Sequence, residues 1–120
     1  MTRKLVAVAA LLTILSLALA ACGGGGGGEA TKISLEAQDI KWSSTSISAA
    51  QGQPVEVTVA NTGALEHNFS VDEFSVNQNV AIGATETVSF TPNSSGTFEF
   101  YCNTPGHKEA GMVGTLTVNP

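Results

Sequence analysis

Basic residues are scarce in this chain of 120 residues. It contains five lysine and arginine residues against ten aspartate and glutamate residues, and charged residues make up only 12% of the sequence. A nucleic-acid-binding protein needs a basic surface that displaces the counterions of the phosphate backbone. The formal net charge of −5 therefore argues against nucleic acid as a partner. An acidic surface is compatible with attraction to a basic protein partner.

The chain is also short and poor in cysteine. A length of 120 residues allows one domain, which excludes a multi-domain enzyme and a multi-pass membrane bundle. The two cysteines, Cys22 and Cys102, allow at most one disulfide.

The first 22 residues differ from the rest of the chain. Seventeen of them are apolar, and Arg3 and Lys4 precede the apolar stretch at 5–18. This arrangement is typical of a secretory signal peptide. The closing Leu19-Ala20-Ala21-Cys22 resembles a bacterial lipobox, which implies cleavage before Cys22 and a diacylglyceryl group on its sulfur. The alternative is an uncleaved N-terminal anchor helix, and both interpretations place the domain outside the cytoplasm, attached to a membrane.

We therefore expect three parts: a lipoprotein signal peptide at 1–21, a lipidated cysteine with a flexible linker at 22–30, and a folded domain at 31–120. The six glycines Gly23–Gly28 give the linker nothing to bury. All ten acidic residues lie at or after Glu29, whereas only three of the five basic residues do. The chain after the glycines thus carries a formal charge of −7.

Short segments with a period of two dominate the chain after residue 30, and no useful helical period is present. Turn-forming clusters of glycine, proline, asparagine and serine separate these segments. The clearest segments are 33–35, 55–59, 67–71, 85–90, 96–102 and 112–118. Residues 77–83 fit either a loop or an irregular strand. The pattern predicts an all-β fold, an antiparallel β-sandwich of seven to eight strands.

The alternation also predicts which way two sulfur atoms point. Phe100 and Cys102 share one face of their segment, and Met112 and Leu116 share one face of theirs. Because these faces carry the apolar residues, the thiol and the thioether are expected to point inward. There they either pack as core residues or bind a metal.

One loop combines a cysteine, a histidine and a methionine at the spacing Cys102-x4-His107-x4-Met112. The other histidine, His67, begins a separate strand segment. A thiolate, two imidazoles and a weak thioether are the ligand set of a blue-copper electron-transfer site. Because these ligands suit both Cu(II) and Cu(I), little has to move when an electron arrives.

Around these residues the sequence resembles the plastocyanin-like cupredoxins, with a loop length similar to that of bacterial auracyanin-type proteins. The matching stretches are Glu66–Phe69, Phe100–Cys102, Pro105–His107 and Gly111–Val118. The resemblance implies a cupredoxin domain at 31–120, a Greek-key β-sandwich with one copper ion at one end that cycles between Cu(I) and Cu(II). It further implies that His67, Cys102 and His107 are the equatorial ligands. Met112 would be the axial ligand.

The resemblance also implies roles for residues around the ligands. Asn68 matches the family position that hydrogen-bonds across to the cysteine loop. His107 would be the electron portal, on a docking rim made of Pro105, Gly106, Ala110, Gly111 and Val113. Glu66 departs from the family pattern, and a carboxylate near copper would favour Cu(II). Lys108 and Glu109 put mixed charge beside the portal.

Together these features predict an electron carrier and not an enzyme. The expected protein is a monomer, lipid-anchored on the periplasmic or cell-surface face of a bacterial membrane. Its partners would be redox proteins such as a cytochrome c or a membrane electron-transfer complex.

Three other functions are less well supported. Copper delivery in extracytoplasmic copper homeostasis is the alternative, but the sequence has no exposed Met- or His-rich tract for metal release. A copper enzyme needs more histidines for a second copper centre. Structural zinc sites normally have four strong ligands, and a thioether is a weak one.

Overall fold

The computed structural model describes residues 28–120, which form nine β-strands and one short 3-10 helix. The predicted signal peptide at 1–21 and Cys22 lie outside the described residues. In chain order the elements are β1 (Thr31–Gln38), β2 (Lys41–Trp42), β3 (Ser46–Ala50), β4 (Val55–Asn61), β5 (His67–Val71), η1 (Asp72–Phe74), β6 (Val76–Val80), β7 (Thr85–Phe90), β8 (Gly96–Tyr101) and β9 (Val113–Asn119). Within residues 28–120, no helix is long and apolar enough to cross a membrane.

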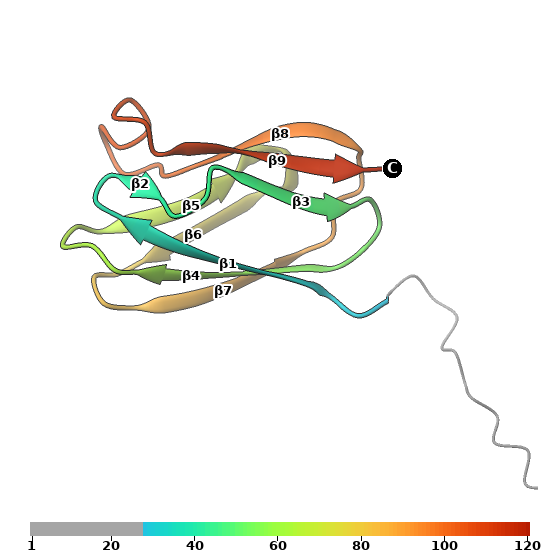
Figure 1. The fold of residues 1–120 in the computed structure, drawn as a ribbon, viewed down its shortest axis with the longest axis horizontal. Coiled ribbons are helices and arrows are strands. Elements are labelled where there is room, and N and C mark those ends of the chain that lie inside the picture. The colour runs from blue at the N-terminus through green and yellow to red at the C-terminus, as the bar shows by residue number, and fades with distance from the viewer. Residues whose placement is uncertain (1–27) are drawn as a thin grey trace, which may run out of the picture.

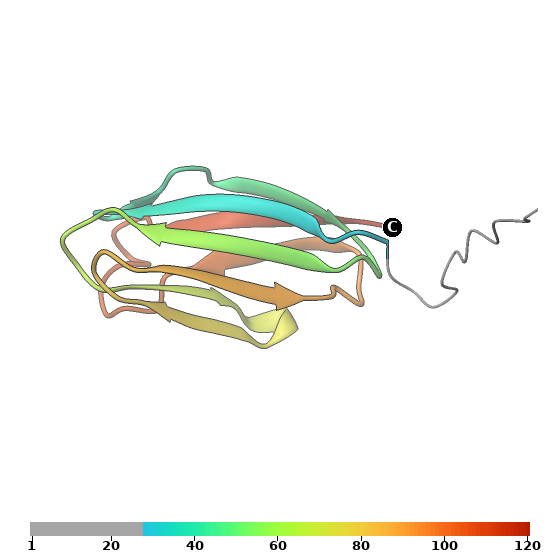
Figure 2. The ribbon, with the colours of Figure 1, turned by 90° about the horizontal axis from the view of Figure 1, so that it is seen from below.

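The strands form two sheets that pack face to face (Figure 1). One sheet has four strands in the order β2-β1-β4-β7, and the other has five in the order β3-β9-β8-β5-β6. Figure 2 shows the two layers from below. The prediction of an all-β sandwich is confirmed.

Two of the strand pairs are parallel, so both sheets of the predicted antiparallel sandwich are mixed. β1 pairs with β4 in parallel, and β3 pairs with β9 in parallel. The remaining pairs are antiparallel. The cause is the path of the chain between the sheets, because β3 lies between β1 and β4 in sequence but belongs to the other sheet. Parallel neighbours need such a crossover, whereas consecutive hairpin strands are antiparallel.

Two short strands, β2 and β3, go beyond the segments that the sequence predicted. β3 contains only two buried apolar side chains, Ile47 and Ala49, which alternate with the exposed Ser46 and Ser48. It is held by its parallel pairing with β9 more than by its own β propensity. The ambiguous stretch at 77–83 contains all of β6 except its first residue, Val76, and then the turn toward β7.

The loops that follow β1, β4, β6 and β8 gather at one end of the sandwich, on the left in Figure 1. The start of β1 and the C-terminus lie at the opposite end. One end is therefore built of loops from both sheets, whereas the chain enters the fold at the other.

Three aromatic side chains fill the core between the sheets. The ring centroids lie 5.8 Å apart for Trp42 and Phe69, 5.7 Å for Trp42 and Phe100, and 5.6 Å for Phe69 and Phe100. Such tilted contacts add to the stabilisation from buried apolar area. Gly114 lies opposite Phe100 on β9, and a side chain there would overlap the Phe100 ring. The missing side chain thus makes room for the aromatic ring.

Candidate metal centre

Three metal-binding side chains converge at the loop end of the sandwich. The donor atoms of His67, Cys102 and His107 all lie within 4.8 Å of one another. Cys102 Sγ is 3.9 Å from His67 Nδ1 and 3.5 Å from His107 Nδ1. The exposed fractions are 1% for His67, 0% for Cys102 and 7% for His107. Both imidazoles thus direct Nδ1 toward one buried thiol.

Strand register explains how two distant residues meet. His67 is the first residue of β5, and Cys102 directly follows β8. β5 and β8 are antiparallel neighbours through Ser70 and Tyr101, which places the start of β5 beside the end of β8. Side chains two positions apart share a face of a strand. The two donors therefore extend the face on which Phe69 and Phe100 fill the core.

The loop from Cys102 to Met112 is closed at its base and folded by its own backbone. Cys102 N–H donates to the carbonyl of Met112 at 3.1 Å, and Met112 N–H donates to the carbonyl of His107 at 3.0 Å. Met112 is fully buried. Gly106 and Gly111 have φ values of 85° and 107°, which favour glycine. The backbone bonds thus place Met112 beside Cys102 and His107 at the base of the loop.

Asn68 links the thiol to the neighbouring strand. Its backbone N–H donates to Cys102 Sγ at 3.3 Å, and its side-chain oxygen accepts from the backbone N–H of Asn103 at 3.5 Å. Its side-chain NH₂ donates to Asn77 Oδ1 at 2.7 Å and to Asn79 Oδ1 at 2.9 Å, both on β6. A hydrogen bond to a thiolate stabilises its negative charge. Asn68 therefore connects β5, β6 and the first residues of the metal-site loop.

A carboxylate that sequence reasoning missed contacts His67. Asp39 Oδ1 lies 3.0 Å from His67 Nε2, and Asp39 Oδ2 accepts from the backbone N–H of Ala64 at 2.8 Å. The hydrogen bond from Ala64, followed by the interaction with His67, holds the pKa of Asp39 below its usual value. Asp39 lies in the turn between β1 and β2. No motif joins it to His67, so only the topology reveals the contact.

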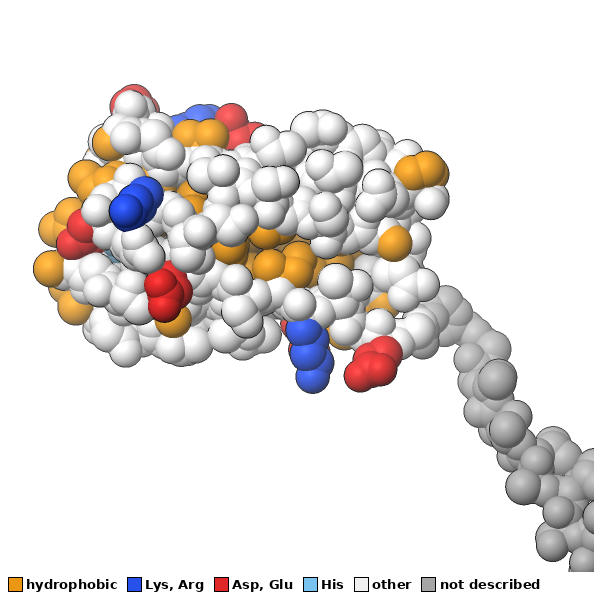
Figure 3. Space-filling view, in the orientation of Figure 1, with side chains coloured by type: hydrophobic (Ala, Val, Ile, Leu, Met, Phe, Trp, Pro, Cys, Tyr) orange, Lys and Arg blue, Asp and Glu red, His pale blue; other side chains and the backbone are white. Residues whose placement is uncertain are grey.

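The surface around His107 is apolar and small. Pro105, Gly106, Ala110 and Gly111 are exposed, and Val113 is half-buried. Two large exposed hydrophobic side chains were not predicted, Leu65 at 43% and Ile82 at 55%. They belong to the β4–β5 and β6–β7 loops at the same end (Figure 1). Figure 3 shows hydrophobic side chains gathered there.

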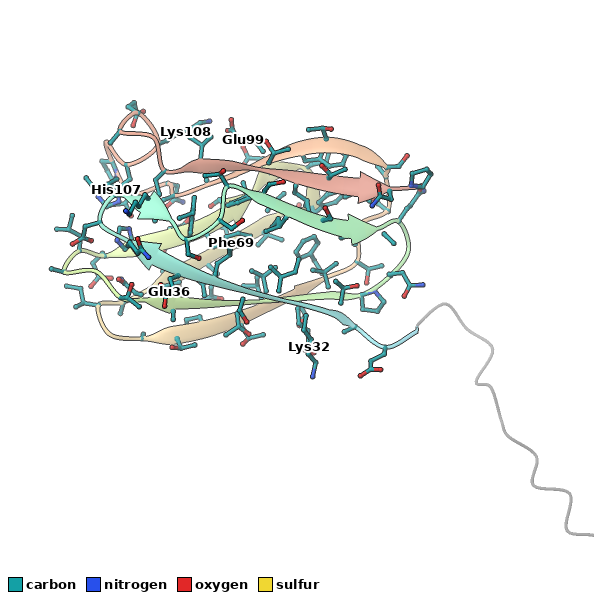
Figure 4. All side chains as sticks on the ribbon, viewed as in Figure 1. Lys32, Glu36, Phe69, Glu99, His107 and Lys108 are labelled. Carbon is teal, nitrogen blue, oxygen red and sulfur yellow. The ribbon has the colours of Figure 1, made fainter. Side chains whose placement is uncertain are left out.

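Of the two charges predicted beside the His107 portal, Lys108 is paired and Glu109 is exposed. Lys108 Nζ lies 2.6 Å from Glu99 Oε1 and 4.4 Å from the centroid of the Tyr101 ring (Figure 4). The hydrogen bond with Glu99 raises the pKa of Lys108. Tyr101 donates its hydroxyl to Asp72 at 2.8 Å, which raises the pKa of Tyr101. Glu66 is exposed, and its backbone carbonyl accepts from the Thr104 hydroxyl at 3.4 Å.

Comparison with known proteins supports the same chemistry. The family model described as a Cupredoxin-like domain matches residues 4–118. The chain belongs to the cupredoxin family. The prediction of a plastocyanin-like cupredoxin is thereby confirmed.

Among its relatives, this cupredoxin is 32% identical to plastocyanin A/B of Petroselinum crispum over 98 residues, 73% of this chain and 97% of that protein. It is 30% identical to the copper-resistant cuproprotein CopI of Rubrivivax gelatinosus over 101 residues, 66% of this chain and 60% of CopI. The chain thus spans less than two thirds of the length of CopI.

Solved structures share the fold of this cupredoxin. Reduced auracyanin from Roseiflexus castenholzii matches with a TM-score of 0.69 and 24% identity, covering 78% of this chain and all of auracyanin. Copper nitrite reductase from Nitrosomonas europaea matches with a TM-score of 0.67 and 18% identity, covering 77% of this chain and 42% of the reductase.

The donor set fits the copper ion of the family. One thiol and two imidazoles lie within 4.8 Å of one another, and a buried thioether adjoins them through the backbone. Soft sulfur with imidazole suits copper in both oxidation states, whereas zinc normally takes four strong ligands. The predicted cofactor is confirmed as one copper ion, with His67, Cys102, His107 and Met112 forming the blue-copper site.

Replacing the thiol tests the assignment. In Cys102→Ser we expect complete loss of the intense visible band of the Cu(II) protein, because a serine hydroxyl supplies no thiolate for charge transfer. The far-UV circular dichroism of the metal-free variant should stay unchanged. Met112→Leu is the control, since a weak thioether ligand would contribute little to that band. A blue Cys102→Ser protein would show that the ligand is wrong.

Proposed function

We propose that this cupredoxin is a single-electron carrier, tethered outside the cytoplasm, and not an enzyme. The observation that carries the proposal is a buried ligand set in which His107 is the most exposed side chain. Cys102 and Met112 are fully buried, whereas His107 retains 7% exposure within an apolar rim. Both histidines of the chain belong to this one cluster, which leaves no histidine for a second copper centre.

The chain's own residues supply a buried site that is held by strands and by hydrogen bonds. Copper, when bound, supplies the one-electron redox couple. The end of β8 and the start of β5 hold Cys102 and His67, and the backbone of the loop holds His107 and Met112. The Asn68 N–H bonded to Cys102 Sγ stabilises negative charge on the sulfur. Because these groups are buried and held in place before the metal binds, we expect little rearrangement to accompany a change of charge.

The apolar rim suits brief docking of a redox partner. Pro105, Gly106, Ala110, Gly111 and Val113 offer small contacts around the His107 portal, and Leu65 and Ile82 enlarge the apolar surface. A small interface of this kind is typical of transient electron-transfer encounters. We propose a redox protein as partner, such as a cytochrome c or a membrane electron-transfer complex. The carrier would act as a monomer.

The tether is the part of the proposal that rests on the sequence alone. The lipobox-like end of the signal peptide at 1–21 supports lipidation of Cys22, with 22–30 as linker to the domain at 31–120. The chain enters β1 at the end opposite the metal centre (Figure 1). A lipid anchor on the periplasmic or cell-surface face of a bacterial membrane would therefore leave the rim facing away from the bilayer.

Copper delivery is the second candidate function. It is favoured by the similarity to CopI, which is named as a copper-resistant cuproprotein. Complete burial of Cys102 and Met112 argues for slow release, because a receiving protein must reach the ligands to exchange them. This burial makes the carrier the better-supported function.

Repeated redox cycling in the presence of a chelator separates the two functions. The copper-loaded protein is mixed alternately with reduced cytochrome c and with ferricyanide, with EDTA present. For a carrier we expect the blue band to bleach and return over many cycles while copper stays bound. Loss of copper to EDTA during the first cycles would favour delivery, and retained copper without electron exchange would contradict the carrier.

A charge placed in the rim should slow docking without changing the copper site. In Leu65→Lys we expect electron exchange with cytochrome c to fall about tenfold, because the ammonium must be desolvated and repels a basic partner. Thr97→Lys adds the same charge to an exposed position of β8 and should leave the rate within about twofold. Stopped-flow kinetics measure both rates. Equal slowing in the two variants would show that the rim is not the docking surface.

The lipid anchor predicts the covalent form of the mature protein. Expressed with its full sequence in a bacterium, the chain should begin at Cys22 and carry the mass of a diacylglyceryl group. Intact-mass spectrometry of the membrane fraction measures this, with Cys22→Ser as the control that cannot accept the lipid. A chain that retains residues 1–21 would instead support the uncleaved anchor helix.

A further inference from the structure

The turn between β1 and β2 contributes a carboxylate to the metal centre, although neither the ligand set nor the rim includes it. Asp39 is 28 residues before His67 in the chain, yet its Oδ1 lies 3.0 Å from His67 Nε2. Its other oxygen, Oδ2, accepts from Ala64 N–H at 2.8 Å. Both oxygens therefore face donors, one from the metal centre and one from the β4–β5 loop.

The β4–β5 loop is shaped to receive this carboxylate. A Cβ atom at Gly63 would overlap the side chain of Asp39, with Cγ only 2.7 Å away. The buried side chain of Asn61 accepts from Gly63 N–H at 3.0 Å, and its NH₂ donates to the carbonyls of Leu65 at 2.8 Å and Val80 at 3.0 Å. The loop is thus fastened on both sides of the position where the carboxylate lies.

The contact determines which nitrogen of His67 carries the proton. A carboxylate accepts hydrogen bonds and donates none, so His67 Nε2 must be the donor in the neutral imidazole. His67 Nδ1 then has a free lone pair, and this atom lies 3.9 Å from Cys102 Sγ. Among residues 28–120, no carboxylate is hydrogen-bonded to His107, so the two imidazoles are held differently.

We propose that Asp39 is a positioning residue for the copper ligand His67. It holds the buried imidazole of His67 as the Nε2–H tautomer and thereby favours binding of Cu(II) over Cu(I). A carboxylate on the outer nitrogen makes the imidazole a stronger donor, which stabilises the more highly charged ion. Asp39 is 35% exposed, so solvent screens part of this effect. The inference rests on the copper site of the proposed function, but not on the identity of the partner or the tether.

Two variants separate the charge of Asp39 from its position. Asp39→Asn keeps one acceptor oxygen but removes the negative charge. Its NH₂ group would face either the Ala64 N–H or His67 Nε2, both of which are donors. We expect the ratio of Cu(II) to Cu(I) affinity to fall about tenfold, which is about 59 mV upward in the one-electron reduction potential. Gly63→Ala leaves the carboxylate in the chain but displaces it, and should shift the potential in the same direction.

The tautomer supplies a readout that needs no copper. Long-range ¹H–¹⁵N correlation spectra of the metal-free protein should show His67 as Nε2–H in the unaltered chain. In Asp39→Ala, signals of both tautomers are expected, because the carboxylate that accepts from the outer nitrogen is absent. Circular dichroism tests whether each variant is folded. If Gly63→Ala does not fold, the NMR spectra of Asp39→Ala still test whether Asp39 selects the tautomer of His67.

Glu66→Gln is the matched control, since it removes an exposed carboxylate next to His67 in the chain. We expect its affinity ratio to change less than about twofold. Equal shifts in Glu66→Gln and Asp39→Asn would overturn the proposal, as would an unchanged tautomer in Asp39→Ala. Either result leaves the cycling experiment with EDTA unaffected, so the carrier function and this inference can fail separately.

Discussion

Burial of the Cys102 thiol between two imidazoles is the constraint on which the rest of the metal centre depends. A buried polar group costs free energy unless it has a hydrogen-bond partner. The thiol receives a backbone N–H from Asn68, and His67 meets the carboxylate of Asp39. These partners come from β5 and from the turn after β1, so the site draws on both sheets. The centre can therefore be built before metal binds, at the cost of constraining several loops.

Rigidity of the centre has a second source in the core beneath it. Phe69 and Phe100 pack against each other and against Trp42. Phe69 lies two positions after His67 on β5, and Phe100 lies two positions before Cys102, which directly follows β8. Close packing resists small displacements, since moving one ring leaves a gap or a clash. Gly114 contributes to the same packing, because the absence of a side chain there leaves room for the Phe100 ring. Core packing and low rearrangement during electron transfer are thus linked.

The sequence predicted the features that depend on local pattern. It missed two features that depend on how distant segments of the chain lie together. Strand alternation indicated the inward direction of Cys102 and Met112, and the spacing of the loop indicated the copper chemistry. The parallel pairing of β1 with β4 was not predicted, because it arises from a crossover between sheets. Asp39 was missed for the same reason, since an aspartate in a turn is ordinary until the topology places it beside His67.

The two histidines are held in ways that fit different tasks. His67 has an exposed fraction of 1% and bonds through its outer nitrogen to Asp39 in the neighbouring turn. His107 has 7% exposure, and its loop is stabilised mainly by its own backbone bonds. A ligand that bonds outward to the scaffold is suited to holding geometry and to setting the balance between Cu(II) and Cu(I). A ligand at the surface among small apolar residues gives a partner the shorter approach to the centre. The asymmetry therefore favours His107 as the electron path and His67 as the anchor of the site.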